Sequence, residues 1–309
     1  MQTILYSFVI PCYRSQGSIN GVVGELLAEF KKECIEIILV CDASPDGTWD
    51  VLTALAKNHP NQVSAILLGR NAGQHNAILC GIRNAKGEII VTMDDDGQHP
   101  IAAVRTVIAG LNSNVDLVYG LPMEERHGFY RNFTSILGKY ILQAVTGSQR
   151  TSALRAFSGH LRGVFDAYHG HACSIDVLLS WGTNRIDYAN VSFRKREIGV
   201  SNYTTGRLIR LAISMLTGYS VWPLKMAAYI GFVSTMFGVV IFSFVMWNYF
   251  VRGTNVQGFT FLAAIVSMFA GLQMFCLGVV GEYLGRMYYR TLDRPPFLVK
   301  DQFIHKSCE

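Results

Sequence analysis

Three consecutive carboxylates, Asp94, Asp95 and Asp96, follow a mostly apolar run at 88–93 and precede Pro100. If that run is an extended strand, alternate side chains share a face, so we expect Asp94 and Asp96 to point one way and Asp95 the other. Two like charges on one face repel each other unless a cation lies between them. Carboxylate oxygens suit Mg2+ or Mn2+, which commonly bind one or two carboxylates together with substrate phosphates. Spacing alone leaves a solvated acidic turn as an equal alternative.

The segments around these carboxylates alternate between strand-like and helix-like patterns. We expect strands at 4–10, 36–41, 63–68, 88–93 and 115–119, and helices at 18–32, 46–58, 73–84 and 100–111. Such alternation predicts a doubly wound α/β fold with a parallel sheet. Ligands of these sheets bind beyond the carboxyl ends of the strands. Polar clusters follow the first four strands, at 11–14, 42–47, 70–73 and 94–96, so we expect four strand ends to meet at one rim.

The charge deficit of the chain is concentrated near its C-terminal end. Only 16% of the 309 residues are charged, against about 25% in typical soluble domains. The segments 226–251 and 253–281 contain no Asp, Glu, Lys or Arg. Each is longer than the roughly 20 residues that cross a bilayer, so two transmembrane helices are expected, at about 226–251 and 256–281. Two buried helices of a soluble core are the alternative.

The basic residues that flank these segments predict their orientation. Lys225 precedes the first segment, whereas the loop between the two carries only Arg252. Further basic residues follow the second segment: Arg286, Arg290, Arg294 and Lys300. The positive-inside bias then places both flanks in the cytoplasm, which predicts a multi-pass protein of the inner (cytoplasmic) membrane with a cytosolic catalytic domain. No signal-peptide pattern opens the chain, and the net charge of +5 gives no case for nucleic acid.

Two other segments, 130–146 and 204–222, mix basic and apolar residues. They fit amphipathic helices in a membrane interface, although a helix packed on the sheet would show the same pattern. The expected organisation is a cytosolic domain at 1–203, an interfacial helix at 204–222, two transmembrane helices within 223–285 and a cytosolic tail at 286–309. The spacing of Gly281 and Gly285 would permit close helix packing and a homo-oligomer.

An ordered set of motifs spans nearly the whole chain. The segments that carry it are 8–13 (FVIPCY), 40–48 (VCDASPDGT), 70–77 (RNAGQHNA), 94–100 (DDDGQHP), 194–203 (RKREIGVSNY), 223–225 (PLK) and 281–286 (GEYLGR). Together they resemble family-2 glycosyltransferases with the GT-A fold, a Rossmann-like and mostly parallel sheet. The resemblance is strongest to the membrane-attached polyprenyl-phosphate glycosyltransferases, the group of dolichyl-phosphate mannose synthase and the bacterial undecaprenyl-phosphate sugar transferases. The sequence departs from the family pattern at Cys41, Ala43, His99 and Ile101.

The resemblance implies a metal-dependent enzyme that transfers a sugar, with inversion, from a nucleotide-sugar to a polyprenyl (undecaprenyl) phosphate. UDP is slightly favoured as the nucleotide. Asp96 would bind Mg2+ or Mn2+ directly, and Asp94 would bind the metal or the sugar. Asp42 would accept hydrogen bonds from the ribose or base. The full set expected at the nucleotide-sugar is Pro11, Tyr13, Asp42, Asn71, Gly73, Asp94, Asp95 and Gln98.

The acceptor phosphate calls for a different set of residues. A lipid monophosphate is largely dianionic near neutral pH and is already a nucleophile, so it needs cations to position it more than it needs a base. Arginine binds phosphate through two parallel contacts. Arg196 is the leading candidate, followed by Arg131, Arg155 and Arg194, with hydroxyl donors from Ser201 and Tyr203. Binding of these arginines to bulk anionic lipid headgroups is the alternative.

Asp176 offers a further catalytic candidate, because it resembles the acidic base at a helix start in other family-2 enzymes. A carboxylate in the first turn of a helix is also ordinary structure. An enzyme that acts on a glycan hydroxyl, or on the hydroxyl of a lipid-linked sugar, would need such a base. That activity and a non-enzymatic membrane partner that retains the fold are the alternative functions. The donor sugar has no signature in the sequence.

Overall fold

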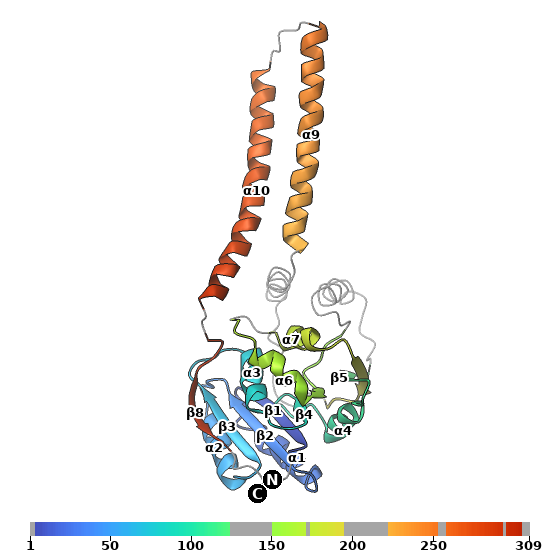
Figure 1. The fold of residues 1–309 in the computed structure, drawn as a ribbon. Helices are drawn as coiled ribbons and strands as arrows, with labels where there is room; N and C mark the ends of the chain where they lie inside the picture. The colour runs from blue at the N-terminus through green and yellow to red at the C-terminus, as the bar shows by residue number, and fades with distance from the viewer. Residues whose placement is uncertain are drawn as a thin grey trace. The chain divides into compact units, whose positions relative to one another are not determined.

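The computed structural model describes residues 4–123, 150–170, 174–194, 222–252, 258–292 and 295–304. The chain divides into two compact units, one from Met1–Asn202 with Asp293–Glu309, and the other from Tyr203–Leu292. The first unit contains the sheet and the second contains two long helices (Figure 1).

The first unit is an α/β fold around a mixed, mostly parallel sheet. The described strands are β1 (Tyr6–Cys12), β2 (Ile35–Cys41), β3 (Val63–Leu68), β4 (Ile89–Thr92), β5 (Leu117–Pro122), β6 (Arg155–Ser158), β7 (Ile186–Val191) and β8 (Val299–Phe303). Their order across the sheet is β7-β5-β6-β4-β1-β2-β3-β8. Strands β1 to β4 pair in parallel, whereas β6 runs antiparallel between β4 and β5. The five strands expected from the sequence are confirmed, and β6, β7 and β8 are additional.

Helices cover both faces of this sheet. The described helices of the first unit are α1 (Ile19–Glu29), α2 (Thr48–Asn58), α3 (Gln74–Asn84), α4 (Ile101–Ala109), η1 (Gly159–Leu161), α6 (Arg162–Asp166) and α7 (Ile175–Gly182). One face packs against α1, α2 and α4, around Phe8, Leu26 and Val104. The other packs against α3, α6 and α7, around Val9 and Phe157. Neighbouring residues of β1 thus face opposite cores, as strand geometry requires.

The helix α3 lies unusually close to the sheet, which fixes the position of its first turn. A Cβ atom added at Gly81 would lie 2.3 Å from Cγ1 of Val9 on β1. Only glycine permits this approach without a shift of the strand or the helix. The loop at Gly73, immediately before α3, is therefore held at the carboxyl end of the sheet.

The C-terminal residues contribute to the same sheet. Strand β8 pairs antiparallel with β3, with Phe303 opposite Ala65. The segment 286–309, expected as a tail beyond the second apolar helix, therefore includes an edge strand of the first unit. The aromatic ring of Phe303 on β8 contacts the ring of Trp49 on α2, with the ring centroids 6.1 Å apart.

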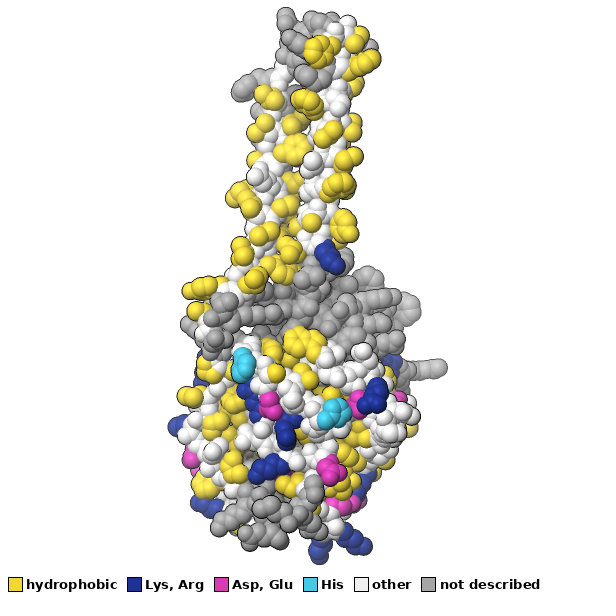
Figure 2. All heavy atoms as spheres, viewed as in Figure 1, with side chains coloured by type: hydrophobic (Ala, Val, Ile, Leu, Met, Phe, Trp, Pro, Cys, Tyr) yellow, Lys and Arg dark blue, Asp and Glu magenta, His cyan; other side chains and the backbone are white. Residues whose placement is uncertain are grey.

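The second unit contains α9 (Trp222–Arg252) and α10 (Phe259–Thr291), which lie side by side (Figure 1). The thiol of Cys276 on α10 contacts the carbonyl of Ala227 on α9 at 3.7 Å. Hydrophobic side chains cover the visible face of both helices (Figure 2). Leu224–Val245 is long and apolar enough to cross a membrane, and Phe269–Gly285 is a shorter apolar helix. The interfacial helices expected at 130–146 and 204–222 lie outside the described residues, apart from Trp222.

Candidate active site

A cavity of about 290 Å3 opens where β1, β2, β3 and β4 end. Its lining comes from all four strand ends and consists of Pro11, Cys12, Tyr13, Asp42, Asn71, Gly73, Gln74, Asp94, Asp95 and Asp96. The polar clusters expected to meet at one rim therefore do so. Parallel strands produce this arrangement because their carboxyl ends lie at one edge of the sheet.

Asp42, at the end of β2, organises one wall of this cavity. The side chain is buried, and its two oxygens accept the N–H groups of Ala72 at 2.6 Å and Gly73 at 2.9 Å. The amide of Asn71 donates to the Asp42 carbonyl at 3.4 Å. Gly73 has φ +89°, a left-handed conformation that favours glycine. Asp42 thus shapes the loop that begins α3, and its carboxylate has further lone pairs that could accept a ligand's hydrogen bonds.

The end of β1, which lies beside β2, forms another wall. Tyr13 is exposed, and the guanidinium of Arg14 lies 5.7 Å from the centroid of its ring. Arg14 has φ +59° and Ala43 has φ +47°, so both loops hold a non-glycine residue in the left-handed region. The N–H of Arg14 donates to Ser44 Oγ at 2.8 Å, which links these two loops. Such backbone strain is maintained by surrounding contacts and is common at ligand sites.

The three carboxylates lie in a loop, because β4 ends at Thr92. The strand expected at 88–93 is confirmed, but strand alternation, from which we expected Asp94 and Asp96 to share a face, does not govern the directions of side chains in this loop. They nevertheless differ in their contacts. Asp94 Oδ1 accepts the amide of Gln74 at 2.8 Å, and Asp96 Oδ1 accepts the N–H of Gln98 at 3.1 Å.

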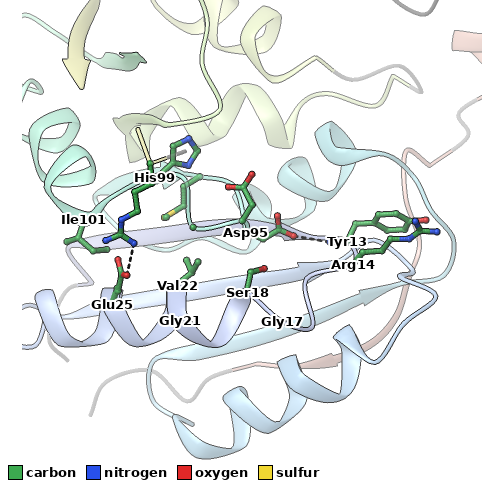
Figure 3. Close-up of a pocket in the computed structure, with 14 residues that line it drawn as sticks. Tyr13, Arg14, Gly17, Ser18, Gly21, Val22, Glu25, Asp95, His99 and Ile101 are labelled. Atoms are coloured by element: carbon green, nitrogen blue, oxygen red, sulfur yellow. Dashed lines mark hydrogen bonds and ion pairs between the residues drawn. The ribbon is translucent and has the colours of Figure 1, made fainter. Parts of the chain in front are cut away.

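Asp95 joins the carboxylate loop to the end of β1 (Figure 3). Its Oδ2 accepts the N–H of Tyr13 at 3.1 Å and the hydroxyl of Ser15. Burial raises the pKa of Asp95, while these two hydrogen bonds act in the opposite direction. Its carboxylate thus engages protein groups at the end of β1, while Asp95 also lines the cavity.

The carboxylate loop offers candidate ligands for a divalent cation. Within the described residues no group of three or more His, Cys, Asp or Glu side chains could hold a metal by itself. Asp94 and Asp96, which are separated by Asp95 along the loop, supply two carboxylates at the cavity. One or two carboxylates completed by substrate phosphates is the donor set that Mg2+ commonly uses. These residues therefore fit a cation shared with a diphosphate.

A second cavity, of about 470 Å3, lies against the same loop and shares Tyr13, Asp95 and Asp96 with the first (Figure 3). Its lining also includes residues at the start of α1, residues around the carboxylate loop such as His99, and Arg194. The guanidinium of Arg194 pairs with Glu25 at 2.8 Å. This is the only residue expected at the acceptor phosphate that lines either cavity within the described part of the chain. Arg131, Arg196, Ser201 and Tyr203 lie outside it.

Arg155 and Asp176 lie together on the α3 side of the sheet, and neither residue lines the two cavities. Their side chains form an ion pair, and the hydroxyl of Tyr119 donates to Asp176 Oδ1 at 3.0 Å. Arg155 is 3% exposed. The expectation that it binds the acceptor phosphate conflicts with this burial, because its charge already has a carboxylate partner.

Three contact residues were not among those expected from the sequence. Gln74 contacts Asp94, Ser15 contacts Asp95, and the buried ring of His99 accepts the N–H of Asp94 at 3.2 Å. Burial lowers the pKa of His99 to about 4. Gln74 directly follows Gly73 in the polar cluster after β3, and this position could have indicated that Gln74 lies at the site. Ser15 is brought to the loop by tertiary folding, whereas His99 lies within the loop, five residues after Asp94.

Comparison with known proteins places these features in a family. Residues 7–169 match the family described as glycosyl transferase family 2. The chain is 30% identical over 302 residues to proteins named undecaprenyl-phosphate 4-deoxy-4-formamido-L-arabinose transferase from Yersinia pestis (strain Pestoides F) and Yersinia pseudotuberculosis serotype O:3 (strain YPIII). Each alignment covers 95% of this chain and 92% of the relative.

Solved structures support the fold. Glucosyl-3-phosphoglycerate synthase from Mycobacterium tuberculosis, in a complex with Mn2+, UDP-glucose and phosphoglyceric acid, superposes with a TM-score of 0.52 at 18% identity. The superposition covers 70% of this chain and 79% of that chain. At this identity the likeness concerns the fold alone. The family match over more than half of the sequence, together with similarity along nearly its full length, shows that this chain is a member of glycosyltransferase family 2.

Proposed function

We propose that this protein transfers a sugar from a nucleotide-sugar to the phosphate of undecaprenyl phosphate, with inversion. The main support is the cavity at the ends of β1, β2, β3 and β4, which is lined by Asp42, Asp94 and Asp96 together. Such a cavity can hold a nucleotide at one side and its diphosphate at the other. The names of the Yersinia relatives support undecaprenyl phosphate as the acceptor.

The donor would lie between the two walls of the cavity. The exposed ring of Tyr13, beside Pro11, offers a face on which a base can stack. Asp42, with the Asn71–Gly73 loop that it holds, would face the ribose or base. Gln98 remains a proposed sugar contact through its side chain. UDP is the first nucleotide to test, and the relatives' names make a formamido derivative of arabinose the first sugar.

A divalent cation, Mg2+ or Mn2+, is part of the proposal. Asp96 would hold it, with Asp94 as a second ligand or a contact to the sugar. When bound, the cation stabilises negative charge that develops on the leaving nucleoside diphosphate. The structural neighbour that holds Mn2+ with UDP-glucose supports this chemistry for the fold. Asp95 is proposed to act behind the site, through its contacts with Tyr13 and Ser15.

The acceptor would attack through a phosphate oxygen. Because its dianion is already nucleophilic, no side chain has to remove a proton. The ion pair between the Asp176 carboxylate and Arg155 supports a reaction without a general base. The cations proposed to position the phosphate are Arg194 and, outside the described residues, Arg131 and Arg196, together with the hydroxyls of Ser201 and Tyr203. A hydroxyl acceptor is the second candidate, and it would require Asp176 to leave its partner.

Membrane attachment completes the proposal. The apolar surface of α9 and α10 supports a transmembrane hairpin, with both flanks in the cytoplasm as the basic residues indicate. The first unit would then work at the cytosolic face of the inner membrane, where a soluble donor can meet a lipid phosphate. The segment 204–222 is proposed as an interfacial helix that leads into α9.

The experiment uses the full chain purified in detergent with a panel of sugar nucleotides. Undecaprenyl phosphate is the acceptor, undecaprenol is the matched control without the phosphate, and products are identified by mass spectrometry. We expect one sugar nucleotide to give a glycosyl-phosphoryl-undecaprenol, with no product from undecaprenol and none in excess EDTA. Product from undecaprenol would favour the hydroxyl acceptor. Absence of both product and nucleotide binding across the panel would favour a non-enzymatic role.

A further inference from the structure

The loop with the three carboxylates closes on the ring of His99. The N–H of Asp94 donates to Nδ1 of His99 at 3.2 Å, across the loop. His99 is 5% exposed, so the acceptor of this backbone N–H is buried. A ring nitrogen that accepts a hydrogen bond carries no proton, which places the proton of the neutral ring on Nε2. Replacing the acceptor would leave the N–H of Asp94 without that partner.

The other side of the ring contacts a distant part of the chain. His99 meets Phe193 edge to face, with ring centroids 4.9 Å apart and an interplanar angle of 73°. The next residue, Arg194, donates its N–H to the carbonyl of Gln98 at 2.9 Å. The adjacent residues Gln98 and His99 of the carboxylate loop thus contact the segment 193–194, which follows β7.

The loop itself has a tight, specific shape. Gly97 has φ +72°, and the N–H of Gln98 donates to Asp96 Oδ1 at 3.1 Å. The contact from Asp94 to His99 closes this turn from end to end. The direction of both candidate metal ligands therefore depends on a backbone turn that His99 Nδ1 closes.

We propose that His99 is a positioning residue of the transfer reaction: its Nδ1 fixes the peptide from which Asp94 and Asp96 project, and its ring anchors that peptide to Phe193. This rests on the proposed metal-diphosphate site. The role is specific to an acceptor atom at the position of Nδ1. A ring that served only as packing would need its shape and not its nitrogen.

Two substitutions separate these roles. In His99→Asn the side-chain oxygen is attached to Cγ, as Nδ1 is, so it can accept the N–H of Asp94 but loses the ring contact with Phe193. In His99→Phe the ring remains and the acceptor is lost. The exposed His160 provides a matched control, His160→Asn.

The measurement is Mn2+ binding to the full-length protein in detergent, by electron paramagnetic resonance of free Mn2+, with UDP, GDP or TDP present. The nucleotide that most strengthens binding to the wild type is used for the variants. We expect His99→Phe to weaken Mn2+ binding roughly tenfold, since a lost buried hydrogen bond has an effect of this order. His99→Asn should stay within about threefold of the wild type, and His160→Asn should match it. Thermal unfolding without ligand is recorded for each variant.

The reverse order, with His99→Phe close to the wild type and His99→Asn weakened, would overturn the positioning role and leave packing. Equal weakening in both variants, in proportion to their loss of thermal stability, would overturn it as well. Wild-type protein that binds no Mn2+ with any nucleotide would overturn the proposed metal site itself. Failure of this inference and failure of the proposed function therefore give different results.

Discussion

The guanidinium of Arg155 on β6 forms an ion pair with the carboxylate of Asp176 in the first turn of α7. Their side chains are 4% and 13% exposed, so the pair is largely shielded from water. Tyr119 on β5 donates to the same carboxylate oxygen. Elements separated in sequence thus meet at one charge pair, which joins α7 to two strands of the sheet.

Asp176→Ala should therefore affect stability strongly. Removing one partner of a buried pair leaves the other charge uncompensated, and we expect a loss of about 3 kcal/mol in the free energy of unfolding. The double variant Arg155→Met with Asp176→Leu should recover most of this loss and retain sugar transfer to undecaprenyl phosphate. Denaturant unfolding in detergent and the transfer assay measure the two effects.

The exposed carboxylate Asp166, which lies 3.9 Å from Arg162, provides the control for this pair. Asp166→Ala should change the free energy of unfolding by less than about 1 kcal/mol. Normal stability of Asp176→Ala, or a stable double variant that has lost all transfer, would contradict the structural role and point to catalysis by Asp176.

Asp42→Asn should weaken donor binding. The carboxylate accepts two backbone N–H groups with its two oxygens, whereas an amide offers only one oxygen, so the loop at Ala72 and Gly73 loses a contact. We expect the KM for the nucleotide-sugar to rise about tenfold, in line with a hydrogen bond to a charged group. Asp50→Asn, at an exposed position in the first turn of α2, should leave KM unchanged. Equal KM values for the two variants would refute this role.

Gln74→Ala should lower kcat/KM modestly. Its amide donates to Asp94 Oδ1 at an exposed position, and a hydrogen bond of this kind contributes about 1 kcal/mol, or roughly fivefold in rate. Initial rates at varied donor and metal concentrations provide the measurement. Gln302→Ala, exposed on β8, is the control and should have no effect. A loss of more than a hundredfold would indicate that Gln74 contacts the reacting groups directly.

The stability of the protein should fall as the pH decreases below about 6.5. Burial lowers the pKa of His75, and the charge of Arg155 lowers it further. The unfolded chain then binds protons that the folded chain does not, so stability is lost as the pH falls through this range, by at most about 1.4 kcal/mol per pH unit for each such histidine. His99 contributes with the same sign.

The variant His75→Asn isolates one of these histidines. Its side-chain oxygen is attached to Cγ, as Nδ1 is, so it can still accept the N–H of Ile175, which contacts His75 Nδ1 at 3.4 Å. Denaturant midpoints between pH 5 and 7.5 should depend less on pH in this variant than in the wild type. His160→Asn, at an exposed position, should retain the full dependence. Identical slopes for His75→Asn and the wild type would contradict the assignment.

The first half of the fold could be predicted from local pattern, because each element there carries its own signal. Strands β2 and β3 are mostly apolar runs, and α1 has helical apolar spacing, so their bounds agree closely with the expected 36–41, 63–68 and 18–32. Strand β6 could not be predicted. It has only four residues, and its place between β4 and β5 is set by long-range pairing.

The site was predictable in its location more than in its contacts. Strand ends in a parallel sheet must meet, so Asp42 and Asp94 could be placed in one cavity. Their hydrogen-bond partners depend on loop geometry that no periodicity encodes. The burial of Arg155 shows the limit most clearly, because the sequence presents it as one more cation and only the antiparallel insertion of β6 turns it toward Asp176.

The proposed function depends most on Asp96, which would hold a metal for the leaving diphosphate during transfer to a lipid phosphate. Sugar transfer to undecaprenyl phosphate by Asp96→Asn, at varied Mn2+ and with Asp50→Asn as the control, tests this role most directly. We expect at least a hundredfold loss of kcat/KM in Asp96→Asn, only partly restored by excess Mn2+, with control activity unchanged. Wild-type rates in Asp96→Asn, with unaltered dependence on Mn2+, would contradict it.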